Sequence, residues 1–165
     1  MHGKIYSKYE APLMGYQPHP NCRCLISCIN SIEVGYATKE GKNGADYWLK
    51  TYGKLPDYYI SFAEAEEKGW QRGDSPSKYF EALMLGSKIY QNSNGHLPDS
   101  PGRIWYEADI NYYSGKRNKH RILYSNDGLM FVTYDHYRTF YEITLEGVMN
   151  FETENNSKSN RFYRM

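Results

Sequence analysis

The sequence lacks the features of a disulfide-rich, membrane-spanning or strongly charged protein. Its only three cysteines crowd into residues 22–28, so they cannot form a disulfide framework for the rest of the chain. No apolar run approaches the ~20 residues of a membrane span, and the N-terminus lacks the apolar core of a secretory signal. The net charge is only +1, so any attraction to a polyanion must be local. We therefore expect no membrane partner and no signal peptide.

What the sequence has is a core-forming length and many aromatic side chains. A chain of 165 residues with 18 tyrosines can build one domain with appendages, and tyrosine suits half-buried strands and stacking surfaces. We predict an irregular N-terminal arm over residues 1–40 with at most one short strand. One domain follows over residues 41–145, and then a flexible tail over residues 146–165. We expect a monomer.

The N-terminal arm contains the run HPNCRC and four side chains that could bind a metal, namely His19, Cys22, Cys24 and Cys28. Zinc sites normally separate paired cysteines by two residues, whereas one residue separates the first two here. Reduced thiols in a poorly ordered arm are the favoured interpretation, and a zinc site is the alternative. HPNCRC also resembles a motif of the minor head (head-morphogenesis) proteins of tailed phages. That resemblance implies that the arm is the remnant of a longer carrier protein.

The first half of the domain shows helical periodicity. Apolar residues at i, i+3, i+4 and i+7 predict a helix over residues 45–52, which Asn43 would cap and Gly53 would close. The SFAE run at residues 61–64 has the spacing of a capping box and predicts a second helix. Proline near a helix start predicts a third helix over residues 76–85.

After Gly86 the apolar period changes from that of a helix to that of a strand. Turn signals such as NSNG and SNDG separate five short runs, residues 87–91, 103–110, 119–125, 128–134 and 139–143. Helices followed by strands predict an α+β domain, with the N-terminal helices packed on one face of a five-stranded antiparallel sheet. We expect the other face to be open.

Alternation along the strands predicts which polar side chains share that open face. Glu107 and Arg121 both alternate with apolar residues that belong against the helices, so they should emerge together. Arg117 lies in a run of cations just before Arg121, and His136 lies in the last turn of the sheet. A carboxylate, a histidine and fixed cations can cleave a phosphodiester by acid/base catalysis without a metal.

The segment from about residue 44 to residue 143 resembles barnase, binase and their relatives among the small bacterial ribonucleases. The motifs TYGKLPDYYIS, AEEKGW, GRIWYEADINYYSG, RILYS and DHYRTF occur in order with matching spacing. The resemblance implies the microbial ribonuclease fold and no cofactor. It also implies metal-independent endonucleolytic cleavage of single-stranded RNA, by transesterification to a 2′,3′-cyclic phosphate followed by hydrolysis.

The same resemblance implies roles for individual residues. Glu107 would be the base that takes the 2′-hydroxyl proton, and His136 would be the acid that protonates the leaving 5′-oxygen. Arg117 and Arg121 would hold the phosphate, and Tyr137 would stack against a base.

In the family, the loop over residues 92–94 binds guanine, so Asn92, Ser93 and Asn94 are the candidate base-binding residues. Ser93 and Asn94 replace an arginine and a glutamate of the family. An amide carries no charge and offers fewer acceptor sites than a carboxylate, so we expect relaxed guanine preference. Arg103 and Asp127 occupy the positions of a structural ion pair.

Two further departures concern charge beside the phosphate. Phe62 stands where the family has an active-site lysine, and Lys88 stands where it has an aspartate. These two family positions lie close together in space. We therefore hypothesise that Lys88 restores, from the other side of the cleft, the charge that Phe62 removes.

The sequence thus predicts a barnase-like endoribonuclease used as a toxin, with single-stranded RNA as substrate and a barstar-like acidic inhibitor as partner. Delivery would be as a secreted or carried part of a larger protein, or the protein would be cytoplasmic if the chain is a fragment. The alternative is a catalytically silent RNA-binding or phage-structural module that keeps the fold, with Phe62 marking the lost activity.

Overall fold

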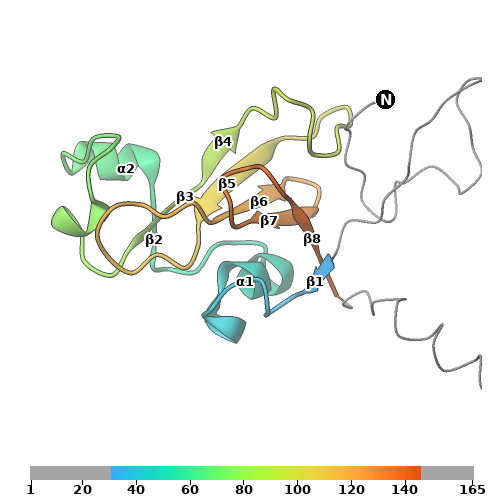
Figure 1. Cartoon of the computed structure of the whole chain (residues 1–165), viewed down its shortest axis with the longest axis horizontal. Coiled ribbons are helices and arrows are strands. Elements are labelled where there is room, and N and C mark those ends of the chain that lie inside the picture. Colours follow the sequence, from blue (N-terminus) through green and yellow to red (C-terminus); the bar gives the residue numbers. More distant parts are fainter. Residues whose placement is uncertain (1–30, 146–165) are drawn as a thin grey trace, which may run out of the picture.

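The computed structural model describes residues 31–145, which form an α+β domain (Figure 1). The four candidate zinc ligands of the arm, the HPNCRC run and the predicted tail over residues 146–165 lie outside the described residues.

A six-stranded sheet with the order β1-β8-β7-β6-β5-β4 forms the centre of the domain. Its last five strands are antiparallel neighbours. They overlap the five predicted runs and are β4 (Lys88–Tyr90), β5 (Trp105–Asp109), β6 (Arg121–Ser125), β7 (Met130–Thr133) and β8 (Tyr141–Thr144). The predicted antiparallel meander is therefore confirmed.

The predicted strand number was wrong, because a sixth strand joins the sheet from the N-terminal side. β1 (Ser31–Glu33) pairs in parallel with β8, with Ser31 opposite Glu142. Three residues are too short to show a period of two, and the partner strand lies more than a hundred positions away in the sequence. The pairing is thus a tertiary feature that local pattern does not reveal.

The first two helices form as predicted. α1 (Ala45–Tyr52) ends at Gly53, whose positive φ of 68° suits a left-handed cap. Gly44 rather than Asn43 is its N-cap, because Asn43 belongs to the 3-10 turn η1 (Gly41–Asn43). α2 (Phe62–Glu67) begins with the predicted capping box, in which Ser61 and Glu64 bond each other's backbone N–H. Neither helix, nor any other in residues 31–145, has the length and apolar character to cross a membrane.

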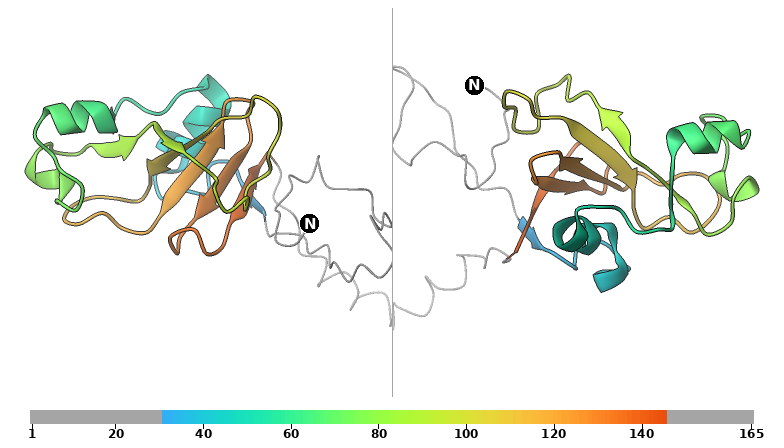
Figure 2. Two further views of the ribbon diagram at one scale, coloured as in Figure 1. Left: turned by 90° about the horizontal axis from the view of Figure 1, so that it is seen from above. Right: turned by 180° about the vertical axis from the view of Figure 1, so that it is seen from behind.

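The predicted third helix is wrong. Only the 3-10 turn η2 (Pro76–Lys78) forms, and the chain then passes through Ala82 at φ 54° into β3 (Met84–Gly86). β3 pairs in parallel with β2 (Tyr59–Ser61) as a separate two-stranded sheet. This pair and α2 lie at the end of the domain away from β1 (Figure 2).

Apolar clusters lie on both faces of the main sheet. On one face, α1 and the loop before it cover residues that include Ala108, Ile110, Ile122 and Val132. On the other, the loop residue Leu97 and Phe140 cover Trp105, Leu123 and Phe131. The expectation of an open second face was therefore wrong for part of its area, since loops as well as helices can bury a sheet. Glu107 and Arg121 lie on this second face.

Candidate active site

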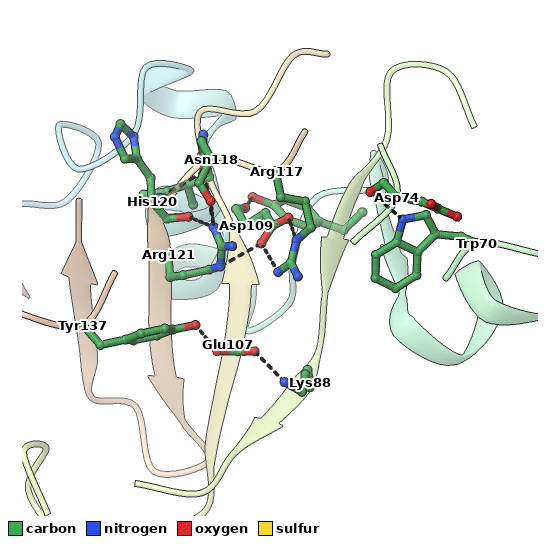
Figure 3. A network of polar contacts seen from close by, with 12 residues as sticks. Trp70, Asp74, Lys88, Glu107, Asp109, Arg117, Asn118, His120, Arg121 and Tyr137 are labelled. Atoms are coloured by element: carbon green, nitrogen blue, oxygen red, sulfur yellow. Dashed lines mark hydrogen bonds and ion pairs between the residues drawn. The ribbon is translucent and has the colours of Figure 1, made fainter. Parts of the chain in front are cut away.

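Glu107 lies in the middle of β5 and both of its carboxylate oxygens are held. Lys88 is directly opposite in the register of β4, and its Nζ donates to Oε1 at 3.1 Å. The Tyr137 hydroxyl donates to Oε2 at 2.6 Å from the other side (Figure 3). Glu107 is 5% exposed, so its position is fixed by packing as well as by these bonds. Because each carboxylate oxygen can accept more than one hydrogen bond, the carboxylate can still accept a proton.

Tyr137 contacts the rest of the protein through its hydroxyl, which binds Glu107, and through its ring, which stacks on Tyr90. Burial, followed by the hydrogen bond to Glu107, raises the pKa of the Tyr137 hydroxyl above its ordinary value, so it remains a donor at neutral pH. Its ring stacks on Tyr90 of β4 with centroids 5.5 Å apart. The structure thus gives the predicted base-stacking residue a second contact, with the carboxylate, that the sequence pattern did not indicate.

Asp109, two residues along β5 from Glu107, anchors both predicted phosphate-binding arginines (Figure 3). Arg117 donates to its two carboxylate oxygens at 2.7 and 2.6 Å. Nε of Arg121 lies 3.0 Å from Oδ1 as an ion pair that is not aligned for a hydrogen bond. Burial opposes the charge of Arg117, but the bonds and charge of Asp109 outweigh it and raise the pKa of that guanidinium.

The arginines retain capacity for a ligand, because Asp109 engages only part of each guanidinium fork. Nη1 of Arg121 donates to the backbone carbonyls of Asn118 and His120. The Asn118 amide in turn donates to the carbonyls of Ile110 and Asn111. These bonds fix Arg121 at the start of β6 and the preceding loop, which carries Arg117. The sequence analysis missed the anchoring roles of Asp109 and Asn118, because these depend on contacts between a strand and a loop that leave no local pattern.

His136 lies in an exposed turn next to Tyr137, and both residues have positive φ, 65° and 70°. The backbone N–H of His136 donates to the carbonyl of Lys119, so the turn is bonded to the loop that carries Arg117. The ring centroids of His136 and Tyr137 lie 4.8 Å apart. A turn with two residues at positive φ and a backbone anchor to Lys119 thus presents the His136 imidazole to solvent beside the Tyr137 ring.

Asp135 holds this turn. Its carboxylate accepts from the backbone N–H groups of Arg138 and Thr139, and from the hydroxyls of Thr139 and Thr133. The hydrogen bond from the Thr139 backbone is the largest influence that lowers the pKa of Asp135, from 3.8 to about 2. The charged carboxylate is therefore the form that the folded turn requires.

This shift predicts a pH-dependent stability contribution from Asp135. Because its folded pKa is depressed, the contribution is present above about pH 4 and disappears as the pH falls through about 2. Asp135→Asn should lower the free energy of unfolding by about 1 kcal/mol at pH 6, since solvent screens an exposed turn. Denaturant unfolding of both proteins at several pH values measures this difference. A difference that stays constant down to pH 2 would contradict the assignment.

The candidate base-binding residues lie beyond the other end of β4. The Asn92 amide is used within its own loop, since it donates to the carbonyl of Leu97 and accepts from the N–H of Leu97. Ser93 and Asn94 are exposed. The structure thus keeps these three residues apart from the hydrogen bonds around Glu107 and Asp109.

The structural ion pair predicted for Arg103 and Asp127 forms. Nε and Nη2 of Arg103 lie 2.9 and 2.8 Å from Oδ2 of Asp127, and Arg103 also donates to the Pro98 carbonyl. The hydrogen bond from Arg103 is the leading cause that lowers the pKa of Asp127. Within residues 31–145, no three His, Cys, Asp or Glu side chains are grouped so that they could hold a metal ion.

Comparison with known proteins identifies the family to which the chain belongs. A family model described as ribonuclease matches residues 41–144. The chain is 43% identical over 101 residues to proteins named "Ribonuclease" from Heyndrickxia coagulans, Bacillus intermedius and Bacillus pumilus. Each match spans 60% of this chain, 91% of the Heyndrickxia protein and 61% of each Bacillus protein. The chain therefore belongs to this ribonuclease family, the group of barnase and binase, and is an endoribonuclease.

Proposed function

We propose that the protein cleaves single-stranded RNA in two acid/base steps that need no metal. Glu107 takes the proton of the 2′-hydroxyl, whose oxygen attacks phosphorus to form a 2′,3′-cyclic phosphate. His136 protonates the 5′-oxygen as its bond to phosphorus breaks. In the second step a water molecule attacks the cyclic phosphate with the two roles exchanged, which leaves a 3′-phosphate.

The observation that carries the proposal is a buried carboxylate with one cation in contact and two more anchored close by along the same strand. Lys88 contacts Glu107 directly, and Arg117 and Arg121 are fixed two residues away through Asp109. Cations that are already positioned stabilise the charge that develops on the phosphate oxygens, without reorganising during the reaction. Guanidinium groups also match the geometry of two phosphate oxygens.

The time course of the products tests this mechanism. Incubation with a short RNA should first release a fragment that ends in a 2′,3′-cyclic phosphate, which then converts to the 3′-monophosphate. Mass spectrometry separates the two by the mass of one water molecule. Fragments that end in a 3′-hydroxyl and 5′-phosphate would contradict the proposal, because the 2′-hydroxyl would then not be the nucleophile.

Lys88 is the proposed replacement for the missing family lysine. The Lys88 side chain is 38% exposed, and its ammonium contacts the carboxylate of Glu107, whose side chain is 6% exposed. Lys88→Ala should lower kcat/KM about 10- to 100-fold, less than the loss of a fully buried oxyanion donor. Lys88→Arg is the matched control and should retain most of the activity, since it keeps the charge. Wild-type activity in Lys88→Ala would contradict the assignment.

We further propose that this activity serves as a toxin and that an acidic, barstar-like protein inhibits it. Carboxylates of such a partner would satisfy the same three cations that hold the phosphate. Expression without an inhibitor should then arrest growth, whereas Glu107→Gln should be tolerated. Growth that is unaffected by the wild-type protein would favour the silent module.

Because Ser93 and Asn94 are exposed and uncharged, we propose that guanine preference is relaxed.

A further inference from the structure

One aromatic ring lies against two of the active-site cations. Nζ of Lys88 lies over the ring of Phe62, 5.5 Å from its centroid. Cζ of Arg117 lies over the same ring at 5.1 Å. Both distances are within the range in which the electrons of a ring face attract a cation. Phe62 therefore connects the lysine that contacts Glu107 to the arginine that Asp109 anchors.

The ring of Phe62 is itself held by the core. Phe62 is 9% exposed and belongs to an apolar cluster with Ile60, Ala65 and Trp70. It meets the Trp70 ring edge-on, with centroids 5.7 Å apart and planes at 78°. As the first residue of α2, it follows the Ser61 capping box directly, which fixes the backbone from which the ring projects. Because packing fixes the position of the Phe62 ring, the ring offers the two cations a binding surface that does not move with them.

A fixed ring counteracts the mutual repulsion of Lys88 and Arg117 and the conformational freedom of the lysine side chain. Two cations that must both reach one phosphate repel each other, and a lysine side chain has many rotamers. A ring face attracts both cations without adding a third positive charge. It also excludes water from one side of each cation, which strengthens their interaction with an anion.

We propose that Phe62 is a positioning residue, whose ring holds the Lys88 ammonium and the Arg117 guanidinium at the phosphate site. The proposal rests on the proposed function for the identity of the ligand as an RNA phosphate. The proposal differs from the view that Phe62 marks lost activity. In the proposal, Phe62 and Lys88 together take over the role of the family lysine. It also predicts that reintroducing that lysine is harmful, since a third cation would lie beside the other two.

Phosphate binding and cleavage, measured side by side, test the proposal. Inorganic phosphate is titrated into the wild-type protein and the variants, with the Arg117 Nε–H resonance as the NMR readout, and kcat and KM are measured on RNA. Phe62→Leu keeps an apolar side chain but removes the ring. It should weaken phosphate binding about three- to tenfold and lower kcat/KM to a similar extent. Phe62→Tyr, which keeps a ring, should have a phosphate affinity and a kcat/KM close to those of the wild-type protein.

Phe80→Leu is the matched control for lost packing. Phe80 is a 7% exposed ring in the same apolar cluster, so its loss should lower stability while leaving phosphate affinity at the wild-type value. Phe62→Lys should bind RNA no better than wild type and cleave it more slowly.

Three results would overturn the proposal. They are wild-type phosphate affinity and kcat/KM in Phe62→Leu, an equal loss of phosphate affinity in Phe80→Leu, and a gain of activity in Phe62→Lys. If the wild-type protein fails to cleave RNA but loses phosphate affinity in Phe62→Leu alone, the positioning role stands and the proposed function fails. The two ideas are thereby tested separately.

Discussion

Glu107→Gln is expected to lower the rate of RNA cleavage by about 10²- to 10⁴-fold, and His136→Ala is expected to have an effect of similar size. Glutamine retains the shape of the glutamate, and its carbonyl can still accept a bond from Lys88 or Tyr137. The loss would therefore reflect proton transfer rather than packing. His136 is exposed, so removal of its imidazole should leave the free energy of unfolding almost unchanged.

The pH dependence of kcat/KM separates the two roles. The wild-type profile should be bell-shaped, because cleavage requires an ionised Glu107 and a protonated His136. Glu107→Gln should lose the acidic limb and His136→Ala the alkaline limb. Steady-state rates on a dinucleotide substrate from pH 4 to pH 9 provide the profiles. A flat wild-type profile, or the same profile in all three proteins, would contradict the assignment.

Asp109→Ala is expected to destabilise the protein by about 3–5 kcal/mol, the usual consequence of removing one partner of a buried charge network. Asp109 is 1% exposed, and it engages Arg117 and the 4% exposed Arg121. Without the carboxylate, two guanidinium groups would face each other in a poorly hydrated site. Denaturant unfolding at neutral pH measures the loss, and phosphate binding should weaken because both arginines lose their anchor.

Asp57→Asn is the matched control for this change. Asp57 pairs with Lys54 at 3.3 Å, but its side chain is 87% exposed, so the substitution should alter the free energy of unfolding by less than about 1 kcal/mol. Equal effects of Asp109→Ala and Asp57→Asn would show that the buried network does not organise the site. Phosphate affinity that persists in Asp109→Ala would show that the arginines are held in another way.

The sequence predicted the elements whose signals are local. α1 has four apolar residues at helical spacing and a glycine at its end, and α2 has a capping box, so each helix is specified within about ten residues. The five antiparallel strands are short runs separated by turn residues. In both cases the chemistry of neighbouring residues determines the local structure.

The wrong predictions concern features that depend on distant residues. Proline at residue 76 does begin a turn, but Tyr79 is 40% exposed and Ala82 adopts positive φ, so no helical face forms. β1 exists because β8 offers a free edge to it. The second sheet face is partly covered because Leu97 and Phe140 fold over Trp105. None of these contacts leaves a periodic signal in the sequence.

The candidate site shows the same division. Alternation placed Glu107 and Arg121 on one face, because the period of a strand fixes the side to which each residue points. The register decides which side chains meet across strands, and it brings Lys88 opposite Glu107 and Arg121 opposite Asp109. The contact of Tyr137 with Glu107 further depends on the conformation of an irregular turn. These features required the structure.

Cleavage of a fluorescent single-stranded RNA in excess EDTA tests the central claim most directly, with Glu107→Gln and His136→Ala measured beside the wild-type protein. We predict that the wild-type protein cleaves in EDTA as fast as in its absence and that both variants lose this activity. Cleavage that EDTA abolishes, or wild-type protein that fails to cleave at all, would contradict a metal-independent reaction performed by these two side chains.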